Sequence, residues 1–312
     1  MPLDPKAQSL IDMFVESGLP PLPESTIEEA RERAETVPML VGDGPEVGNV
    51  EEVTIPSSAG GIPARIYTPK GEVAGTVMYI HGGGWVVGSL KSFDPFCRFL
   101  TDASGCVVVS IDYRLAPENP FPAGLDDCFT ALQWVAANRQ QGALAIAGDS
   151  SGGNLAAVVA RRARDAGGPE IAFQFLGCPV TDADLDNGSY VQHGGPEPVL
   201  LLGRDDMVWF WDLYVPNEAD RANPDVSPLQ ADDLSGLPPA YIVVAEYDPL
   251  RDEGLAYAEK LRADGVPVTL RTYDDQPHDF QIMINFLERA DECIRDAAKA
   301  MREALAGAAA RV

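Results

Sequence analysis

Ser150 lies between two nearby glycines, at the point where a buried strand is expected to end and a helix to begin. Residues 144–147 are small or branched apolar residues, which predicts a buried strand, and a helical pattern begins at Ser151. Gly148 and Gly152 lie two residues before and two residues after Ser150, where a tight turn leaves little room for side chains. Such a Gly-x-Ser-x-Gly turn presents the serine hydroxyl as a nucleophile at the end of the strand.

A serine nucleophile needs a base, and the chain offers three histidines: His81, His193 and His278. His278 follows the strand expected at residues 268–273 and therefore lies at the same edge of the sheet as Ser150. His81 precedes three glycines, which suits a backbone role, and His193 lies in a glycine-rich insertion. Position in the chain thus favours His278 as the base.

The base needs a carboxylate to orient it, and an acidic loop follows the strand expected at residues 241–245. Asp248 is the preferred candidate because it lies beyond the strand and Pro249 fixes the backbone just after it. A purely structural role, as the N-cap of the next helix, is the alternative for this residue. Asp252 lies one turn into that helix, and the sequence alone does not separate the two carboxylates.

Backbone amides for an oxyanion are expected from a glycine loop that follows the strand at residues 76–80. Gly82, Gly83 and Gly84 allow the backbone to approach a substrate closely. Ser151 adds its own amide at the start of a helix. The spacing of the glycines matches neither common phosphate-binding motif, so it favours acyl transfer over nucleotide binding.

The elements that must position these groups alternate between strands and helices. Strands are expected at residues 50–55, 62–67, 76–80, 106–111, 144–147, 171–176, 241–245 and 268–273. The first two strands form an antiparallel hairpin. Helices are expected at residues 122–137, 151–165 and 280–305, and a further helix that follows the strand at 241–245 is expected to end at residue 261. This alternation predicts one α/β domain with a largely parallel sheet covered by helices on both faces.

Two segments interrupt the alternation, and we expect them to form a helical cap. Residues 1–45 precede any strand and show amphipathic helical spacing. Residues 183–225 form an insertion with an aromatic helix around residues 207–211. The α/β core is accordingly expected at residues 46–182 and 226–312.

Composition narrows the classes of partner and cofactor. The net charge of −25 argues against nucleic acid or an anionic membrane as a partner. No apolar run is long enough to span a bilayer and no signal peptide is visible, so we expect a cytoplasmic protein without stable membrane insertion. Five scattered cysteines and three histidines predict reduced, buried thiols and no metal centre.

Taken together, the motifs resemble those of the hormone-sensitive lipase family of α/β-hydrolases, also called bacterial family IV carboxylesterases. The stretches that carry the resemblance occur in the family's order: HGGGW at 81–85, DYRLAPE at 112–118, GDSSGGN at 148–154, DPLRDE at 248–253 and PH at 277–278. The resemblance, to the GDSAG branch in particular, implies a mostly parallel eight-stranded sheet with a helical cap. It also implies these roles: nucleophile Ser150, acid Asp248, base His278, and oxyanion donors among Gly82, Gly83, Gly84 and Ser151.

The activity that this resemblance implies is hydrolysis of short- to medium-chain acyl esters, through an acyl-enzyme on Ser150 and without a metal or organic cofactor. Related enzymes often form homodimers, so a homodimer is expected. Amide cleavage, as in arylacetamide deacetylases, stays open as an alternative. Gibberellin receptors share the fold as non-catalytic binding proteins but lack the histidine, and the presence of His278 argues against that role.

Two residues depart from the family's pattern. Ser151 replaces the usual alanine, which leaves its backbone amide available. Asp279 replaces the glycine that usually follows the catalytic histidine. A carboxylate at this place either stabilises the protonated base, which predicts an altered pH dependence of hydrolysis, or accepts hydrogen bonds from the amides of the terminal helix.

Overall fold

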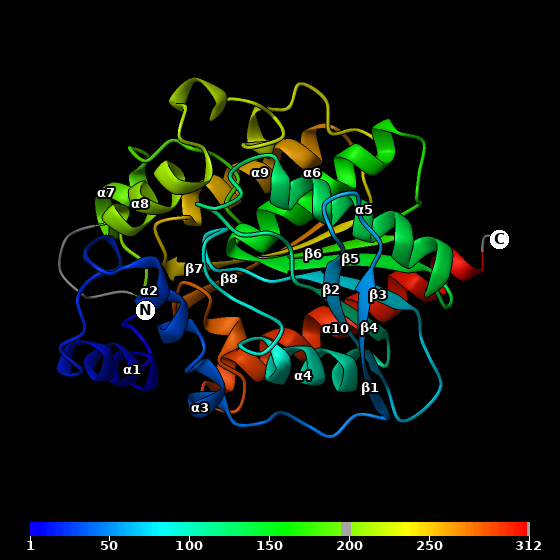
Figure 1. Ribbon diagram of the computed structural model, residues 1–312, viewed down its shortest axis with the longest axis horizontal. Coiled ribbons are helices and arrows are strands. Elements are labelled where there is room, and N and C mark those ends of the chain that lie inside the picture. Colours follow the sequence, from blue (N-terminus) through cyan, green and yellow to red (C-terminus); the bar gives the residue numbers. More distant parts are fainter. Residues whose placement is uncertain (195–200, 311–312) are drawn as a thin grey trace.

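An eight-stranded sheet forms the centre of the protein (Figure 1), seen in a computed structural model that describes residues 1–194 and 201–310. Its strands are β1 (Asn49–Ile55), β2 (Ile62–Thr68), β3 (Thr76–Ile80), β4 (Val107–Ile111), β5 (Leu144–Asp149), β6 (Phe173–Gly177), β7 (Ala240–Tyr247) and β8 (Val268–Pro277). They lie in the order β1-β2-β4-β3-β5-β6-β7-β8. The pairings β1–β2 and β2–β4 are antiparallel and all others are parallel, which confirms the predicted sheet.

Helices cover both faces of this sheet. The helices are α1 (Pro5–Glu16), α2 (Ile27–Ala34), α3 (Val37–Val41), α4 (Asp94–Ser104), α5 (Ala123–Asn138), α6 (Ser150–Asp165), α7 (Gly188–His193), α8 (Arg204–Tyr214), α9 (Arg251–Ala263) and α10 (Glu288–Ala309). In Figure 1, α5, α6 and α9 lie above the sheet, whereas α4 and α10 lie below it. The two faces make two apolar cores because successive side chains of a strand point in opposite directions. In β3, Met78 joins the core of α5 and α6, and Val77 joins that of α4 and α10.

On either side of His278, two element boundaries differ from the sequence-based expectation. The last helix begins at Glu288 instead of residue 280, because Phe280–Ile282 forms a single 3₁₀ turn and Asn285 takes a positive φ of 63°. Strand β8 continues to Pro277, so His278 directly follows a strand instead of lying in a loop. Helix α4 is an addition that the sequence analysis did not anticipate.

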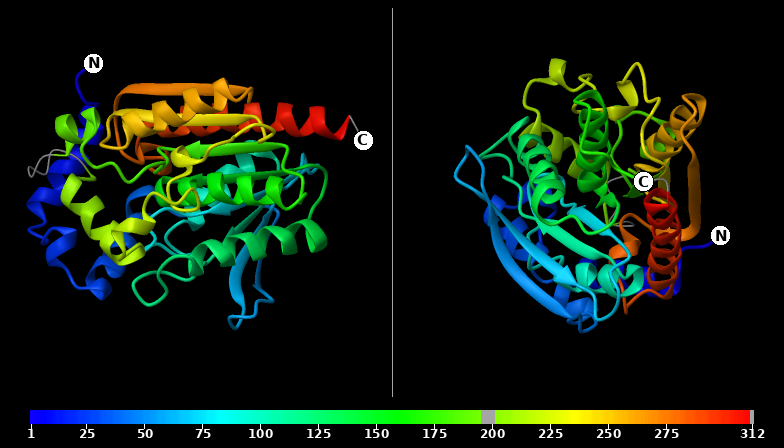
Figure 2. Two further views of the ribbon diagram at one scale, coloured as in Figure 1. Left: turned by 90° about the horizontal axis from the view of Figure 1, so that it is seen from above. Right: turned by 90° about the vertical axis from the view of Figure 1, so that its right-hand side faces the viewer.

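The two segments expected to form a cap lie together at one end of the sheet (Figure 2). Helix α8 packs against the turn Leu22–Glu24, which joins α1 to α2. The division of the chain into cap and core stays a prediction. Residues 195–200, which belong to the second segment, lie outside the described residues.

Arg31 of α2 ties the first segment to the core. Its guanidinium donates hydrogen bonds to the backbone oxygens of Val86 and Ala116, both at 3.0 Å. It also forms a bidentate ion pair with Glu118, with N–O distances of 2.8 and 2.7 Å. A planar guanidinium offers its donors in a fixed fork, so this one side chain joins α2 to three groups of the core at once.

All five cysteines are buried and free of disulfide bonds, as their scattered positions predict. None of the helices within residues 1–194 and 201–310 combines the length and the apolar character needed to cross a bilayer.

Candidate active site

Ser150 sits at a sharp turn between β5 and α6. Its φ of +51° is unusual for a residue with a side chain and is held in place by close backbone packing. A Cβ atom added to Gly148 would lie 2.2 Å from the Gly152 carbonyl oxygen, and one added to Gly152 would lie 2.1 Å from the Ile80 carbonyl oxygen. Both glycines are therefore required for the turn that directs the Ser150 hydroxyl toward His278.

Replacing Gly152 with alanine is expected to lower the free energy of unfolding by about 1–3 kcal/mol or more, because the new methyl group meets backbone atoms that cannot move aside. Chemical denaturation measures this loss. The control is Gly307→Ala in α10, where an added Cβ meets nothing within 4 Å and a modest gain in stability is expected. Equal stability changes in the two variants would contradict the account of the turn.

The structure brings Ser150, His278 and Asp248 together from three strand ends. The Ser150 Oγ lies 3.0 Å from His278 Nε2, and His278 Nδ1 lies 2.8 Å from Asp248 Oδ2. Asp248 also accepts a hydrogen bond of 2.8 Å from the Leu250 amide. Asp252 instead pairs with Arg251 at 3.0 Å, so geometry separates the two carboxylates that the sequence left open.

The hydrogen bonds define the direction in which a proton can travel. A carboxylate only accepts, so in the neutral His278 ring the proton lies on Nδ1 and the lone pair of Nε2 faces the Ser150 hydroxyl. Burial lowers the pKa of this imidazole, but the carboxylates of Asp248 and Asp279 outweigh it and raise the pKa well above its ordinary value. The arrangement can accept the hydroxyl proton as the serine attacks a carbonyl carbon.

The glycine loop after β3 lies next to Ser150, but its first amide is already used. The Gly82 N–H donates to both carboxylate oxygens of Asp149, at 3.1 and 3.2 Å. This differs from the expectation for Gly82, since an amide engaged by a buried carboxylate is not free for a substrate oxygen. Gly83 and Gly84, with φ of +104° and +56°, make the turn and leave their amides, with that of Ser151, as the candidate donors.

Two side chains whose contacts the sequence analysis did not predict hold this loop in place. Asp149 accepts hydrogen bonds from the Tyr79 hydroxyl and from Gly82, and burial raises the pKa of its carboxyl well above the ordinary value. The Ser151 hydroxyl accepts a hydrogen bond of 3.2 Å from the Trp85 amide. In the sequence, these contacts were indicated only by the position of Asp149 beside Ser150 and by the serine that replaces alanine at position 151.

The other two histidines make different contacts. His81 is buried, with its Nδ1 2.8 Å from the Gly82 carbonyl oxygen and its ring stacked on Tyr113. His193 lies beside Tyr247 at the end of α7. Of the three histidine rings, that of His278 lies within hydrogen-bond distance of the Ser150 hydroxyl.

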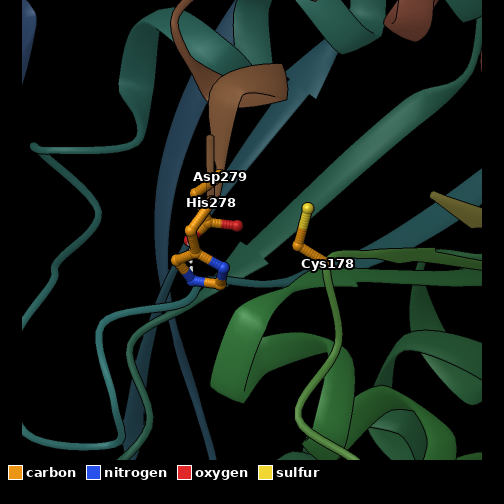
Figure 3. A group of neighbouring side chains, drawn as sticks. All are labelled: Cys178, His278 and Asp279. Carbon is orange, nitrogen blue, oxygen red and sulfur yellow. Dashed lines mark ion pairs between the residues drawn. The ribbon is translucent and has the colours of Figure 1, made fainter. Parts of the chain in front are cut away.

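One group of side chains in the described part of the chain has the composition of a metal site: Cys178, His278 and Asp279 (Figure 3). Their ligand atoms lie within 4.8 Å of one another. Burial raises the pKa of the Cys178 thiol well above its ordinary value, and the thiol points its hydrogen toward Gln281 at 3.4 Å. A metal requires the thiolate, so we assign these side chains to the hydrogen-bond network around the base.

Comparison with known proteins places this geometry in a family. A family described as having the alpha/beta hydrolase fold matches residues 77–282. The carboxylesterase NlhH of Mycobacterium tuberculosis is 40% identical over 299 residues, which cover 91% of this chain and 89% of that protein. An arylesterase of Saccharolobus solfataricus is 35% identical over 287 residues, which cover 90% and 92% of the two chains.

The solved structures agree with these relatives. The hyperthermophilic esterase of Pyrobaculum calidifontis has a TM-score of 0.91 and 39% identity, and the match covers 97% of this chain and 99% of that one. The chain therefore belongs to the α/β-hydrolase fold family, in the hormone-sensitive lipase-like branch that its motifs resemble.

Proposed function

We propose that the protein is a serine carboxylesterase that hydrolyses short- to medium-chain acyl esters through an acyl-enzyme on Ser150. The observation that carries the proposal is the unbroken series of contacts from Ser150 Oγ through His278 to Asp248, at 3.0 and 2.8 Å. The coarser class, a carboxylic ester hydrolase, is confirmed by the esterases and carboxylesterases that match most of the chain.

In the first half of the reaction, His278 Nε2 takes the Ser150 proton while Oγ bonds to the ester carbonyl carbon. The amides of Gly83, Gly84 and Ser151 are the donors for the resulting oxyanion. The carbon–oxygen bond to the alcohol then breaks, and the alcohol leaves with the proton from Nε2. In the second half, water repeats these steps on the acyl-enzyme and releases the carboxylic acid and the free serine.

The test is hydrolysis of p-nitrophenyl esters from acetate to laurate, with the p-nitroanilide of a preferred acyl group in parallel. Turnover that is greatest for short and medium chains, with little on the anilide, is the expected result. Preference for the anilide would instead favour the amidase alternative. Saturable binding of small molecules without turnover of any activated ester or anilide would favour a binding protein.

The aromatic helix α8 suggests where acyl-chain length is selected. Phe210 covers the glycine loop so closely that a Cβ on Gly84 would lie 2.1 Å from its ring. Trp211 instead packs on Trp85, with ring centroids 4.7 Å apart, and so joins α8 to the core.

Replacing Phe210 with alanine is expected to raise the rate on octanoate relative to acetate on the order of tenfold, because the lost ring opens apolar space beside the loop. The ratio of kcat/KM for the two p-nitrophenyl esters measures the change. Leu213→Ala, a half-buried position on the same helix, serves as the control and should leave the ratio as it was. An unchanged ratio in the Phe210 variant would place the acyl group elsewhere.

A further inference from the structure

Asp279 brings a second carboxylate to the base. Its Oδ2 lies 3.3 Å from His278 Nε2, the same nitrogen that lies 3.0 Å from the Ser150 hydroxyl. Asp248 occupies the other ring nitrogen, Nδ1, at 2.8 Å. The imidazole therefore lies between two carboxylates, and Figure 3 shows Asp279 beside its ring.

The Asp279 side chain is held at this place by its neighbours. Its backbone has a φ of +54°, a left-handed conformation that aspartate tolerates better than most residues. Its Oδ1 accepts a hydrogen bond of 2.8 Å from the Gln281 amide group. Gln281 is fully buried and its oxygen in turn accepts the thiol hydrogen of Cys178 at 3.4 Å. The carboxylate is thus fixed toward the base instead of turned to solvent.

We propose that Asp279 stabilises the protonated ring of His278 during acyl transfer and thereby sets the pH below which hydrolysis is lost, with Gln281 as the positioning residue that holds it. The inference rests on the proposed function of Ser150 and His278.

The chemistry of the step explains why a second carboxylate matters. When Ser150 attacks, its proton moves to Nε2 and the ring gains a positive charge, which later leaves with the proton on the alcohol oxygen. The Asp279 carboxylate lies 3.3 Å from Nε2 and therefore faces the ring while the ring is positively charged. An opposite charge within about 4–6 Å of a titrating group commonly shifts its pKa by about 1–3 units.

The ionisable groups around the ring come from each neighbouring strand end. Asp248 follows β7 and Asp279 follows His278 itself, and both carboxylates raise the pKa of the imidazole. Asp149 ends β5, where burial raises the pKa of its carboxyl and favours the neutral form. Cys178 follows β6 and stays a neutral thiol for the same reason. The negative charges that face the ring are therefore those of Asp248 and Asp279.

The same attraction acts on the resting protein. A base works only when neutral, so hydrolysis is present above the pKa of His278 and is lost as the pH falls through it. Asp279 holds this pKa high. At high pH, where the resting ring is neutral, Asp279 raises the rate because it stabilises the charged ring in the transition state. At lower pH the same attraction favours the protonated ring in the resting protein, so the range of pH in which the base is active becomes narrower.

The experiment compares kcat/KM for p-nitrophenyl acetate across pH in the wild-type protein and in Asp279→Asn, which keeps the shape and the tolerance of a left-handed backbone. We expect the acidic limb to move down by about one pH unit and the plateau to fall by up to about tenfold. At low pH the two curves should converge, because there the ring is protonated both in the resting protein and in the transition state.

Three further variants separate charge from structure. Asp274→Asn removes a charge from an exposed position on β8, the strand that precedes His278, and should leave the profile unchanged. Asp279→Gly suits the φ of +54° and should shift the acidic limb as the asparagine does. Gln281→Leu releases the carboxylate and should move the limb in the same direction by a smaller amount.

An unchanged acidic limb in Asp279→Asn and Asp279→Gly would overturn the inference, as would a loss of rate by one factor at every pH. The pH dependence of Ser150 modification by phenylmethylsulfonyl fluoride gives a second readout of His278 that needs no turnover. If the wild-type protein hydrolyses no ester, the proposed function fails. A lower pH limit for modification in Asp279→Asn would still support the role of Asp279, and identical limits would overturn it.

Discussion

Replacing Ser150 with alanine is expected to lower kcat for p-nitrophenyl acetate by about 10⁴- to 10⁶-fold, as the removal of a serine nucleophile does elsewhere. The hydroxyl is the group 3.0 Å from His278 Nε2, and no acyl-enzyme can form without it. Stopped-flow and steady-state hydrolysis measure the loss, and intact-mass spectrometry should detect an acyl adduct in the wild-type protein and none in the variant.

The matched control for this prediction is the neighbouring serine. Ser151→Ala keeps the backbone amide proposed for the oxyanion and loses only the hydroxyl that accepts from Trp85, so its effect should be far smaller. A Ser150→Ala protein that folds normally and keeps more than a small fraction of wild-type turnover would refute the assignment of the nucleophile.

Asp248→Asn is expected to reduce kcat by roughly 10⁴-fold while leaving the fold intact. Asp248 lies 2.8 Å from His278 Nδ1, and an asparagine there can donate its NH₂ group to that nitrogen. Nδ1 then has no hydrogen and Nε2 carries it, so the ring presents a hydrogen instead of a lone pair to the Ser150 hydroxyl. The charge that stabilises the protonated ring is lost as well. Steady-state kinetics near the plateau pH, with circular dichroism as the test of folding, measures the effect.

Asp252→Asn provides the comparison, because it changes the other carboxylate that the sequence left open. Asp252 pairs with Arg251 on α9 and does not contact His278, so its loss should change kcat by less than about threefold. If instead Asp252→Asn inactivates the protein and Asp248→Asn does not, the two carboxylates have been assigned the wrong way round.

The sequence was sufficient to predict the parallel sheet and the meeting of Ser150 and His278 at its edge, because both follow from local patterns. Apolar runs mark strands, and the carboxyl ends of parallel strands lie at one edge. That reasoning placed Ser150 and His278 together even though 127 residues separate them in the chain. The observed distance of 3.0 Å agrees with it.

The remaining details depend on contacts between distant segments and could not be read from local patterns. The use of the Gly82 amide by Asp149 depends on how closely β3 and β5 approach. The choice of Asp248 over Asp252 depends on where α9 begins relative to β8. The late start of α10 depends on the turn that follows His278, where Phe280 is buried in the core below the sheet.

The contacts of Arg31 have a consequence for protein engineering. Caps are natural targets for exchange between related enzymes, since they are expected to select the substrate. A chimaera whose new N-terminal segment lacks an arginine at this place would leave the Val86 and Ala116 carbonyls and the Glu118 carboxylate without their shared donor. Val86 lies two residues after Gly84, so the loss of this contact would disturb the glycine loop itself. Grafts that retain this arginine should therefore keep activity more often than grafts chosen by length or sequence identity alone.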